Sequence, residues 1–204
     1  MTIEIKRLSP ERIADFFDFF DHRAFTDNPP WGGCYCIGWQ MTKEEEQAQV
    51  HDQAAAYGGD QDAFMRALRE VVVRQIQADV LQGYLAYVDG LPIGWCNAND
   101  KVNFPETSAN GFHFHCPTPG REKAVVCFEI APAYRGKGVA TALLARVVED
   151  AAAEGYEAIE AYPCVHDQRD EWDYPGPIRL YEKAGFTQTA EQPDGVRVMR
   201  KELL

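Results

Sequence analysis

The segment from Val125 to Ala151 limits what this chain can fold into more than any other part of it. An apolar run leads to Pro132, a turn with two glycines and two cations follows, and apolar residues then recur at helical spacing: Val139, Leu143, Leu144, Val147 and Ala151. The order is therefore a strand, a glycine-rich turn and a helix. The first N–H groups of a helix have no partner within it, and the helix dipole favours negative charge there. The segment thus predicts a site for an anion such as phosphate.

Two common phosphate-binding motifs fit this turn poorly. A P-loop needs Ser or Thr after its lysine to reach Mg²⁺, but Gly138 follows Lys137. The dinucleotide-binding fingerprint needs three glycines at fixed spacing and an acidic residue further along the chain. Ala140 could stand for the third glycine, but the first glycine is at the wrong distance. Both interpretations are therefore weak.

Two other motifs carry a resemblance to a known family. Arg135, Gly138 and Ala140 match the R/Q-x-x-G-x-G/A signature of the GNAT acyltransferase superfamily, and the segment 180–186, LYEKAGF, resembles the LYEKxGF segment that closes the same fold. The interval between the two motifs suits a helix, a strand and a loop. The chain is similar to this family from about Gly83 onwards. The resemblance implies one α/β domain over residues 1–204, with a mixed twisted sheet of about six to seven strands, flanked by helices and splayed between its central strands.

The resemblance also implies acetyl-CoA as the acyl donor. The backbone of residues 137–141 would hold the pyrophosphate, and main-chain groups of residues 128–130 would bind the pantetheine arm. No metal is required for this chemistry. The residues expected to contact the cofactor are Phe128, Glu129, Ile130, Arg135, Gly136, Lys137, Gly138, Val139, Ala140, Thr141 and Tyr181.

Acyl transfer of this kind needs a neutral amine, a donor for the developing oxyanion and a hydrogen bond to the leaving thiolate. Tyr181 matches the family tyrosine that is assigned to the thiolate. A phenol has a pKa of about 10 and a thiol of about 8.5, so hydrogen bonding is easier than full proton transfer. Packing in the core is the structural alternative for this side chain.

The general base is an open question in the sequence. Ala124 stands where several family members carry a catalytic glutamate. Glu129 and Glu160 are the candidates, because burial can raise a carboxyl pKa towards neutrality. An ion pair with an arginine such as Arg146 or Arg179 is an equally good interpretation of either glutamate.

The irregular segment 25–40 is rich in aromatic residues and glycine, and we expect it to form a wall of the substrate site. It contains Cys34 and Cys36, two of six cysteines in the chain. Zinc needs four ligands, and no second pair of closely spaced cysteines follows. We expect buried thiols in a reducing compartment. The alternative function is a CoA-binding or cysteine-based sensory module without transferase activity.

Local signals predict further elements. These are a strand over residues 3–7, a helix capped by Ser9, a capping box at Thr42 and Glu45, a helix from about Gln61, and a hairpin at Asp89-Gly90.

Composition limits the classes of partner that the protein can be expected to bind. The net charge of −12 argues against nucleic acid and against an anionic membrane, because both attract clustered cations. The sequence shows neither a membrane span nor a signal peptide, so we expect a cytoplasmic protein. The acceptor would be an amine of a small molecule or a peptide, chosen by the loops 25–40, 99–123 and 163–177. A homodimer is compatible with the sequence.

Overall fold

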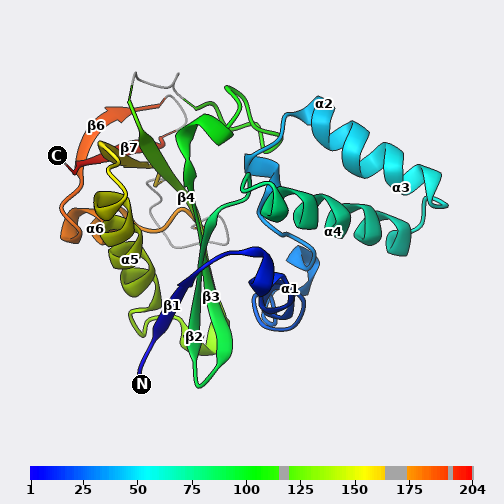
Figure 1. The fold of residues 1–204 in the computed structure, drawn as a ribbon, viewed down its shortest axis with the longest axis horizontal. Coiled ribbons are helices and arrows are strands. Elements are labelled where there is room, and N and C mark those ends of the chain that lie inside the picture. Colours follow the sequence, from blue (N-terminus) through cyan, green and yellow to red (C-terminus); the bar gives the residue numbers. More distant parts are fainter. Residues whose placement is uncertain (115–119, 164–173, 193–194, 204) are drawn as a thin grey trace.

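The computed structural model describes residues 1–114, 120–163, 174–192 and 195–203. In these residues, seven strands form one mixed sheet in the order β1-β2-β3-β4-β5-β7-β6 (Figure 1), which confirms the expected fold class. β4 and β5 are parallel, and the other neighbouring strands are antiparallel. The strands are β1 (Glu4–Arg7), β2 (Gly83–Val88), β3 (Leu91–Asp100), β4 (Glu122–Ile130), β5 (Ala158–Ala161), β6 (Thr187–Glu191) and β7 (Arg197–Glu202).

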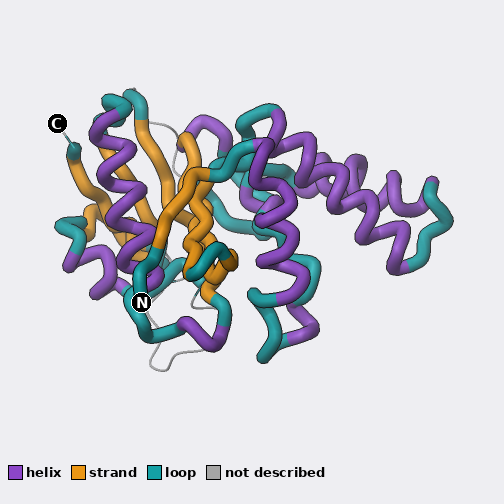
Figure 2. The backbone as a smooth tube through the Cα atoms, turned by 60° about the horizontal axis from the view of Figure 1, so that its bottom comes forward, coloured by secondary structure: helices purple, strands orange, loops and turns teal. Residues whose placement is uncertain are grey.

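Helices cover both faces of the sheet (Figures 1 and 2). α5 and α6 pack on one face, and α1 and α4 pack on the other. α2 and α3 are joined by a π-helical turn, Gln47–His51, and together they lie beside α4 and project away from the sheet in both views. No described helix is both long and apolar enough to cross a membrane. The helices are α1 (Ile13–His22), α2 (Lys43–Glu46), α3 (Asp52–Ala56), α4 (Gln61–Gln77), α5 (Val139–Ala153) and α6 (Ile178–Lys183).

Most of the local signals act as predicted. Thr42 Oγ1 accepts a hydrogen bond from the Glu45 N–H at 3.2 Å, and the Glu45 carboxylate accepts one from the Thr42 N–H at 2.8 Å, which completes the capping box. Asp89 and Gly90 both have positive φ, at 51° and 79°, as a tight hairpin between β2 and β3 requires.

Ser9 is an exception, because its side chain does not cap a helix. A 3₁₀ turn, Pro10–Arg12, comes between Ser9 and α1. The Ser9 hydroxyl instead accepts a hydrogen bond from the Arg12 guanidinium at 2.7 Å. The prediction of a Ser9 cap is therefore wrong, since a nearby cation takes the acceptor that would have met the helix N–H groups.

The helix after the glycine-rich turn buries the side that its spacing predicts. All five apolar residues that recur along α5 are buried against the sheet: Val139, Leu143, Leu144, Val147 and Ala151. On the opposite face, Phe16 and Phe20 of α1 pack on Trp95 of β3, with ring centroids 5.0 and 6.3 Å apart. Complete burial of a large apolar side chain contributes roughly 1.5–3 kcal/mol, so these two layers hold the helices on the sheet.

The central strands separate part of the way along β4. Pairing between β4 and β5 runs from Glu122 opposite Ala158 to Val125 opposite Ala161. Beyond Val125, β4 continues to Ile130 and pairs with β3 alone among the described strands. Val126 lies at a β-bulge, because Asn97 pairs with Cys127 and Ala98 with Val125. This is the expected splay, and it opens at Val126.

Candidate active site

The turn between β4 and α5 is exposed and open. Gly136 and Gly138 have φ of 73° and 84°, a region that glycine adopts without steric cost. No described heavy atom lies within 4 Å of a Cβ built on either glycine. No described side chain caps α5, so its first N–H groups point into open space after Gly138. The residues expected to bind the cofactor pyrophosphate are thus together in one turn that has room for an anion.

The Arg135 side chain lies across the base of this turn. Its Nε donates to the Ile130 carbonyl at 2.9 Å, and its two terminal nitrogens contact the carboxylates of Asp27, at 2.5 Å, and Glu129, at 3.4 Å. Arg135 therefore ties the segment before Trp31 to the end of β4. Asp27 is a site residue that sequence reasoning missed, because an ion pair across 108 residues leaves no local pattern.

The environment of Glu129 suits a group that exchanges protons near neutral pH. Glu129 lies opposite Trp95 in the sheet, and its side chain is 13% exposed. Burial raises the pKa of this carboxyl to about 7, although the Arg135 guanidinium favours the charged form. At pH values above 7 it can accept a proton.

Glu160 lies in a cluster of charged side chains that does not include Glu129. Its carboxylate contacts Lys101 at 2.8 Å and Arg200 at 3.0 Å, and it accepts a hydrogen bond from the Tyr162 hydroxyl at 2.9 Å. Glu122 contacts the same two cations, at 2.9 and 2.8 Å. Two carboxylates and two cations balance in charge. The structure does not bring Glu160 to Glu129, and Glu160 faces Ala124 in the parallel register instead.

The hydroxyl of Tyr181 is hydrogen-bonded to a main-chain carbonyl of the protein. Tyr181 is fully buried in α6, and its hydroxyl donates to the Pro175 carbonyl. One residue earlier, the Tyr174 carbonyl accepts from the Phe128 N–H at 2.6 Å. Burial raises the pKa of Tyr181 well above its ordinary value. The Phe128 N–H of β4 therefore bonds to the Tyr174 carbonyl, and the Tyr181 hydroxyl bonds to the next carbonyl along the chain, that of Pro175.

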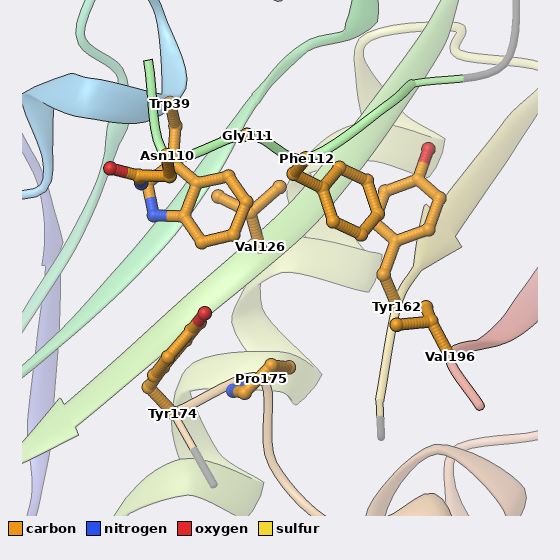
Figure 3. A pocket seen from close by; sticks show the side chains of 9 residues that line it. All are labelled: Trp39, Asn110, Gly111, Phe112, Val126, Tyr162, Tyr174, Pro175 and Val196. Carbon is orange, nitrogen blue, oxygen red and sulfur yellow. The ribbon is translucent and has the colours of Figure 1, made fainter. Parts of the chain in front are cut away.

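A pocket of about 190 Å³ opens beside the splay (Figure 3). Val126 forms its floor, at the bulge of β4, and Tyr162 follows β5 directly. The remaining lining residues come from the 3₁₀ turn Ile37–Trp39, from two loops and from the residue before β7. The complete lining is Trp39, Asn110, Gly111, Phe112, Val126, Tyr162, Tyr174, Pro175 and Val196.

The thiols of Cys34 and Cys36 lie near Glu129. The Cys36 thiol donates to Cys127 of β4 at 3.4 Å. A hydrogen bond to Cys127 and burial raise the pKa of Cys36. Cys34 is exposed, so the expectation that it is buried is wrong, and a hydrogen bond to Cys36 raises its pKa. Among the described residues, no group of three or more His, Cys, Asp or Glu side chains could hold a metal ion.

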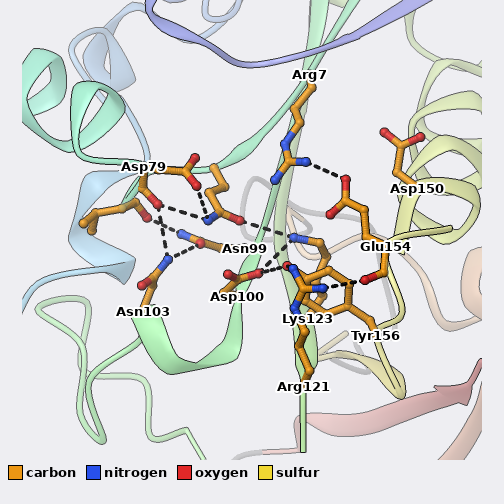
Figure 4. Close-up of polar contacts among 12 residues, drawn as sticks. Arg7, Asp79, Asn99, Asp100, Asn103, Arg121, Lys123, Asp150, Glu154 and Tyr156 are labelled. Carbon is orange, nitrogen blue, oxygen red and sulfur yellow. Dashed lines mark hydrogen bonds and ion pairs between the residues drawn. The ribbon is translucent and has the colours of Figure 1, made fainter. Parts of the chain in front are cut away.

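A second polar cluster lies at the opposite end of β4 (Figure 4). Lys123 is buried, contacts Asp100 at 3.1 Å and Gln82 at 3.3 Å, and lies over the Tyr156 ring. Burial lowers the pKa of Lys123, and Asp100 partly offsets this effect. Nearby, Arg7 of β1 pairs with Glu154 after α5 at 2.6 Å. The cluster joins the ends of β3 and β4 to α5 and lies away from the splay.

Solved structures with the same fold include known acetyltransferases. The chain superposes on a GNAT-family acetyltransferase from Streptococcus pneumoniae with a TM-score of 0.56 and 16% identity, over 100% of both chains. It superposes on the PaiA N-acetyltransferase of Thermoplasma acidophilum, solved with coenzyme A, with a TM-score of 0.52 and 16% identity, over 99% of both chains. YncA of Salmonella typhimurium, solved with acetyl-CoA, gives a TM-score of 0.53 and 17% identity, over 100% of this chain and 95% of that one.

The family assignment rests on sequence as well as on fold. No curated protein matches the chain. The family model described as acetyltransferase (GNAT) family matches residues 39–186, which include the splayed strands, the glycine-rich turn and Tyr181. The protein therefore belongs to the GNAT family of acetyltransferases.

Proposed function

We propose that this protein is an acetyl-CoA-dependent N-acetyltransferase that acetylates a primary amine of a small molecule or a peptide. The observation that carries the proposal is the uncapped start of α5 behind Gly138, at the end of a strand that separates from its parallel neighbour. The backbone N–H groups of residues 137–141 would hold the pyrophosphate, with Lys137 adding positive charge. Acetyl-CoA supplies an activated acetyl thioester.

Three groups of the protein would then serve the transfer. The Phe128 N–H is a donor that can face the developing oxyanion once it exchanges the Tyr174 carbonyl for substrate. Glu129 would take the proton of the attacking amine, directly or through water, because its pKa is raised to about 7. The Tyr181 hydroxyl would turn from the Pro175 carbonyl to the leaving thiolate. Amine and donor would be bound together, and the amine would attack directly.

The alternative function, a cysteine-based sensor, is less well supported. A redox sensor needs an accessible thiolate. Cys36 and Cys127 are buried; Cys34 is exposed, but its raised pKa, like that of Cys36, favours the protonated thiol. A CoA-binding module without activity would still use the turn at Gly138, so only a transfer assay separates it from an enzyme.

Acetyl-CoA binding and acetyl transfer are tested separately. A ligand at 100 times its Kd stabilises a folded protein by about 2.7 kcal/mol, so acetyl-CoA should raise the melting temperature measurably. Release of CoA thiol in the presence of a panel of primary amines should then exceed release without amine. An unchanged melting temperature would rule out both the enzyme and the CoA-binding module. A raised melting temperature without amine-dependent thiol release would favour the module.

A further inference from the structure

The pocket of Figure 3 has an unusual lining for a site that takes a charged amine. Four of its nine described lining residues are aromatic, namely Trp39, Phe112, Tyr162 and Tyr174, and none of the nine carries a charge. Asn110 supplies the one amide side chain among them. A polycationic ligand would lose its hydration in such a site without gaining a counter-charge, which is costly. The lining favours a ligand that is mostly apolar.

The size of the pocket suits one ring. Its volume is about 190 Å³. A cavity of about 150 Å³ lined by apolar side chains is enough to bind benzene in another protein. The rings of Trp39 and Phe112 are 5.6 Å apart at 66°, and those of Phe112 and Tyr162 are 5.1 Å apart at 59°. Rings inclined in this way can present both edges and faces to a flat guest, at the spacings that aromatic pairs prefer.

The walls of the pocket are fixed before any ligand arrives. The Tyr162 hydroxyl donates to Glu160, which is itself held by two cations. The loop that carries Phe112 is closed by a hydrogen bond from the Ser108 N–H to the Phe112 carbonyl at 2.9 Å. The Ala109 N–H donates to the Met41 carbonyl at 2.6 Å, which joins this loop to the Trp39 segment. A preformed site loses little conformational entropy when it binds.

The segment carrying Asn110 also packs tightly on the Trp39 segment. A Cβ built on Gly38 would lie 2.4 Å from the Asn110 side-chain oxygen, so this contact needs glycine at position 38. The Asn110 amide lies close to Gly38 and beside Trp39 in the lining of the pocket (Figure 3).

The pocket adjoins the groups to which we assign the chemistry. Val126 is two residues before Phe128 in β4, and Tyr174 supplies both a wall of the pocket and the carbonyl that accepts from the Phe128 N–H. A ligand whose ring lies against Trp39 and Phe112 can therefore direct a short chain along β4 towards Phe128.

We propose, on the basis of the transferase function above, that the acceptor is a small primary amine carrying one flat apolar ring, such as an arylalkylamine. The ring occupies the pocket and lies against Trp39, Phe112 and Tyr162. The amine, as the free base, attacks the acetyl carbonyl, and its nitrogen forms the amide bond as the carbon–sulfur bond breaks and CoA leaves as the thiolate. The proton that the nitrogen loses passes to Glu129, directly or through water. The described lining residues carry no charge that would offset a long polyamine or an aminoglycoside, so we expect both to be poor acceptors.

The test compares 2-phenylethylamine with spermidine and kanamycin in the thiol-release assay. We expect kcat/KM for 2-phenylethylamine to be at least about 10-fold higher than for either polycation, and Phe112→Ala to lower it by about 10-fold or more, as the loss of an apolar contact in a specificity pocket does. Phe112→Leu, which keeps an apolar side chain, should have a kcat/KM between those of the wild type and Phe112→Ala. Phe64→Ala is the matched control, because Phe64 is a half-buried phenylalanine of α4, packed beside His51. The KM for acetyl-CoA should stay unchanged in all variants.

Calorimetric titration of 2-phenylethylamine into the wild type and Phe112→Ala gives a readout that does not depend on transfer. Binding to the wild type that weakens in Phe112→Ala, but not in Phe64→Ala, supports the ring site even if acetyl-CoA neither binds nor reacts, in which case the transferase proposal alone fails. Acetylation of spermidine or kanamycin without acetylation of 2-phenylethylamine would overturn the ring-site inference and leave the transferase proposal intact. Absence of 2-phenylethylamine binding at millimolar concentration would also overturn it.

Discussion

The hydroxyl of Tyr181 donates a hydrogen bond to the main-chain carbonyl of Pro175, at the start of the segment that leads into α6. Tyr174, one residue earlier, is bonded through its carbonyl to the Phe128 N–H of β4. The segment 174–175 is thus fastened both to the sheet and to the helix that carries the proposed thiolate donor. Substrate binding would have to exchange both hydrogen bonds for contacts with the acyl donor.

Replacement of Tyr181 should affect both rate and stability. Tyr181→Phe leaves the Pro175 carbonyl without its donor in a buried place, which should cost about 1–3 kcal/mol of unfolding free energy in urea denaturation. Loss of the hydrogen bond to the thiolate should lower kcat by about 10-fold or more. Tyr57→Phe is the matched control, since Tyr57 directly follows α3 and its hydroxyl donates to Glu70 of α4. A kcat within about a factor of two of the wild type would disprove the thiolate role.

Glu129 should impose a pH dependence on the reaction. Its pKa is raised from 4.5 to about 7 in the folded protein, so kcat/KM should contain a rising limb with a midpoint near pH 7, as the carboxyl becomes able to accept a proton. Glu129→Gln should lose that limb, while the limb due to the amine substrate should persist. A Glu129→Gln profile that keeps the limb would exclude Glu129 as the base.

The same shift predicts a change in stability. Between pH 4.5 and about 7 the folded protein binds more protons at Glu129 than the unfolded chain does, so this group makes stability fall as the pH rises. At pH 8, Glu129→Gln should therefore be more stable than the wild type, by up to about 3 kcal/mol, and at pH 4 the difference should disappear. Urea denaturation of the wild type and Glu129→Gln at both pH values measures this difference in unfolding free energy. Glu149→Gln, which alters an exposed glutamate of α5, should show no such gain.

The two possible roles of Glu160 can be separated by measuring stability beside activity. Glu160→Gln leaves the buried Lys101 and the partly exposed Arg200 with one carboxylate fewer, and breaking a buried ion pair such as Lys101–Glu160 costs about 3–5 kcal/mol. Glu202→Gln removes an exposed partner of the same Arg200 and should cost less than about 1 kcal/mol. We expect Glu160→Gln to lose stability and to keep most of its activity per folded molecule. Loss of activity with unchanged stability would instead identify Glu160 as the base.

We expect Gly138 to be required for acetyl-CoA binding as well as for the backbone conformation of the turn. Gly138→Ala places a Cβ at a φ of 84°, which costs roughly 1–2 kcal/mol, and puts a methyl group at the open start of α5. Gly155→Ala is a close match, because Gly155 has a φ of 76°, has no described heavy atom within 4 Å of a built Cβ, and follows the other end of α5. Both variants should lose similar stability, but the KM for acetyl-CoA should rise in Gly138→Ala alone. Equal KM values would argue against the turn as the pyrophosphate site.

The local elements were predictable because each depends on a few adjacent residues. The helical face of α5 follows from a repeat of apolar residues, the capping box from the interval between Thr42 and Glu45, and the hairpin from Asp89-Gly90. Ser9 shows the limit of such signals, since a neighbouring arginine was enough to divert its hydroxyl. The splay at Val126 was expected only through the family resemblance, because pairing between strands leaves no short motif.

The sequence by itself determined the strand, turn and helix that open a site for an anion, because glycine conformation and helix periodicity are local properties of the chain. The tertiary structure alone decided which charges and rings meet around that site. Glu160 lies 59 positions from Lys101 in the sequence, and Trp39 lies 73 positions from Phe112, yet each pair is in contact. The physical reason is that ion pairs and aromatic contacts act through space, over a few ångströms, whatever the separation along the chain.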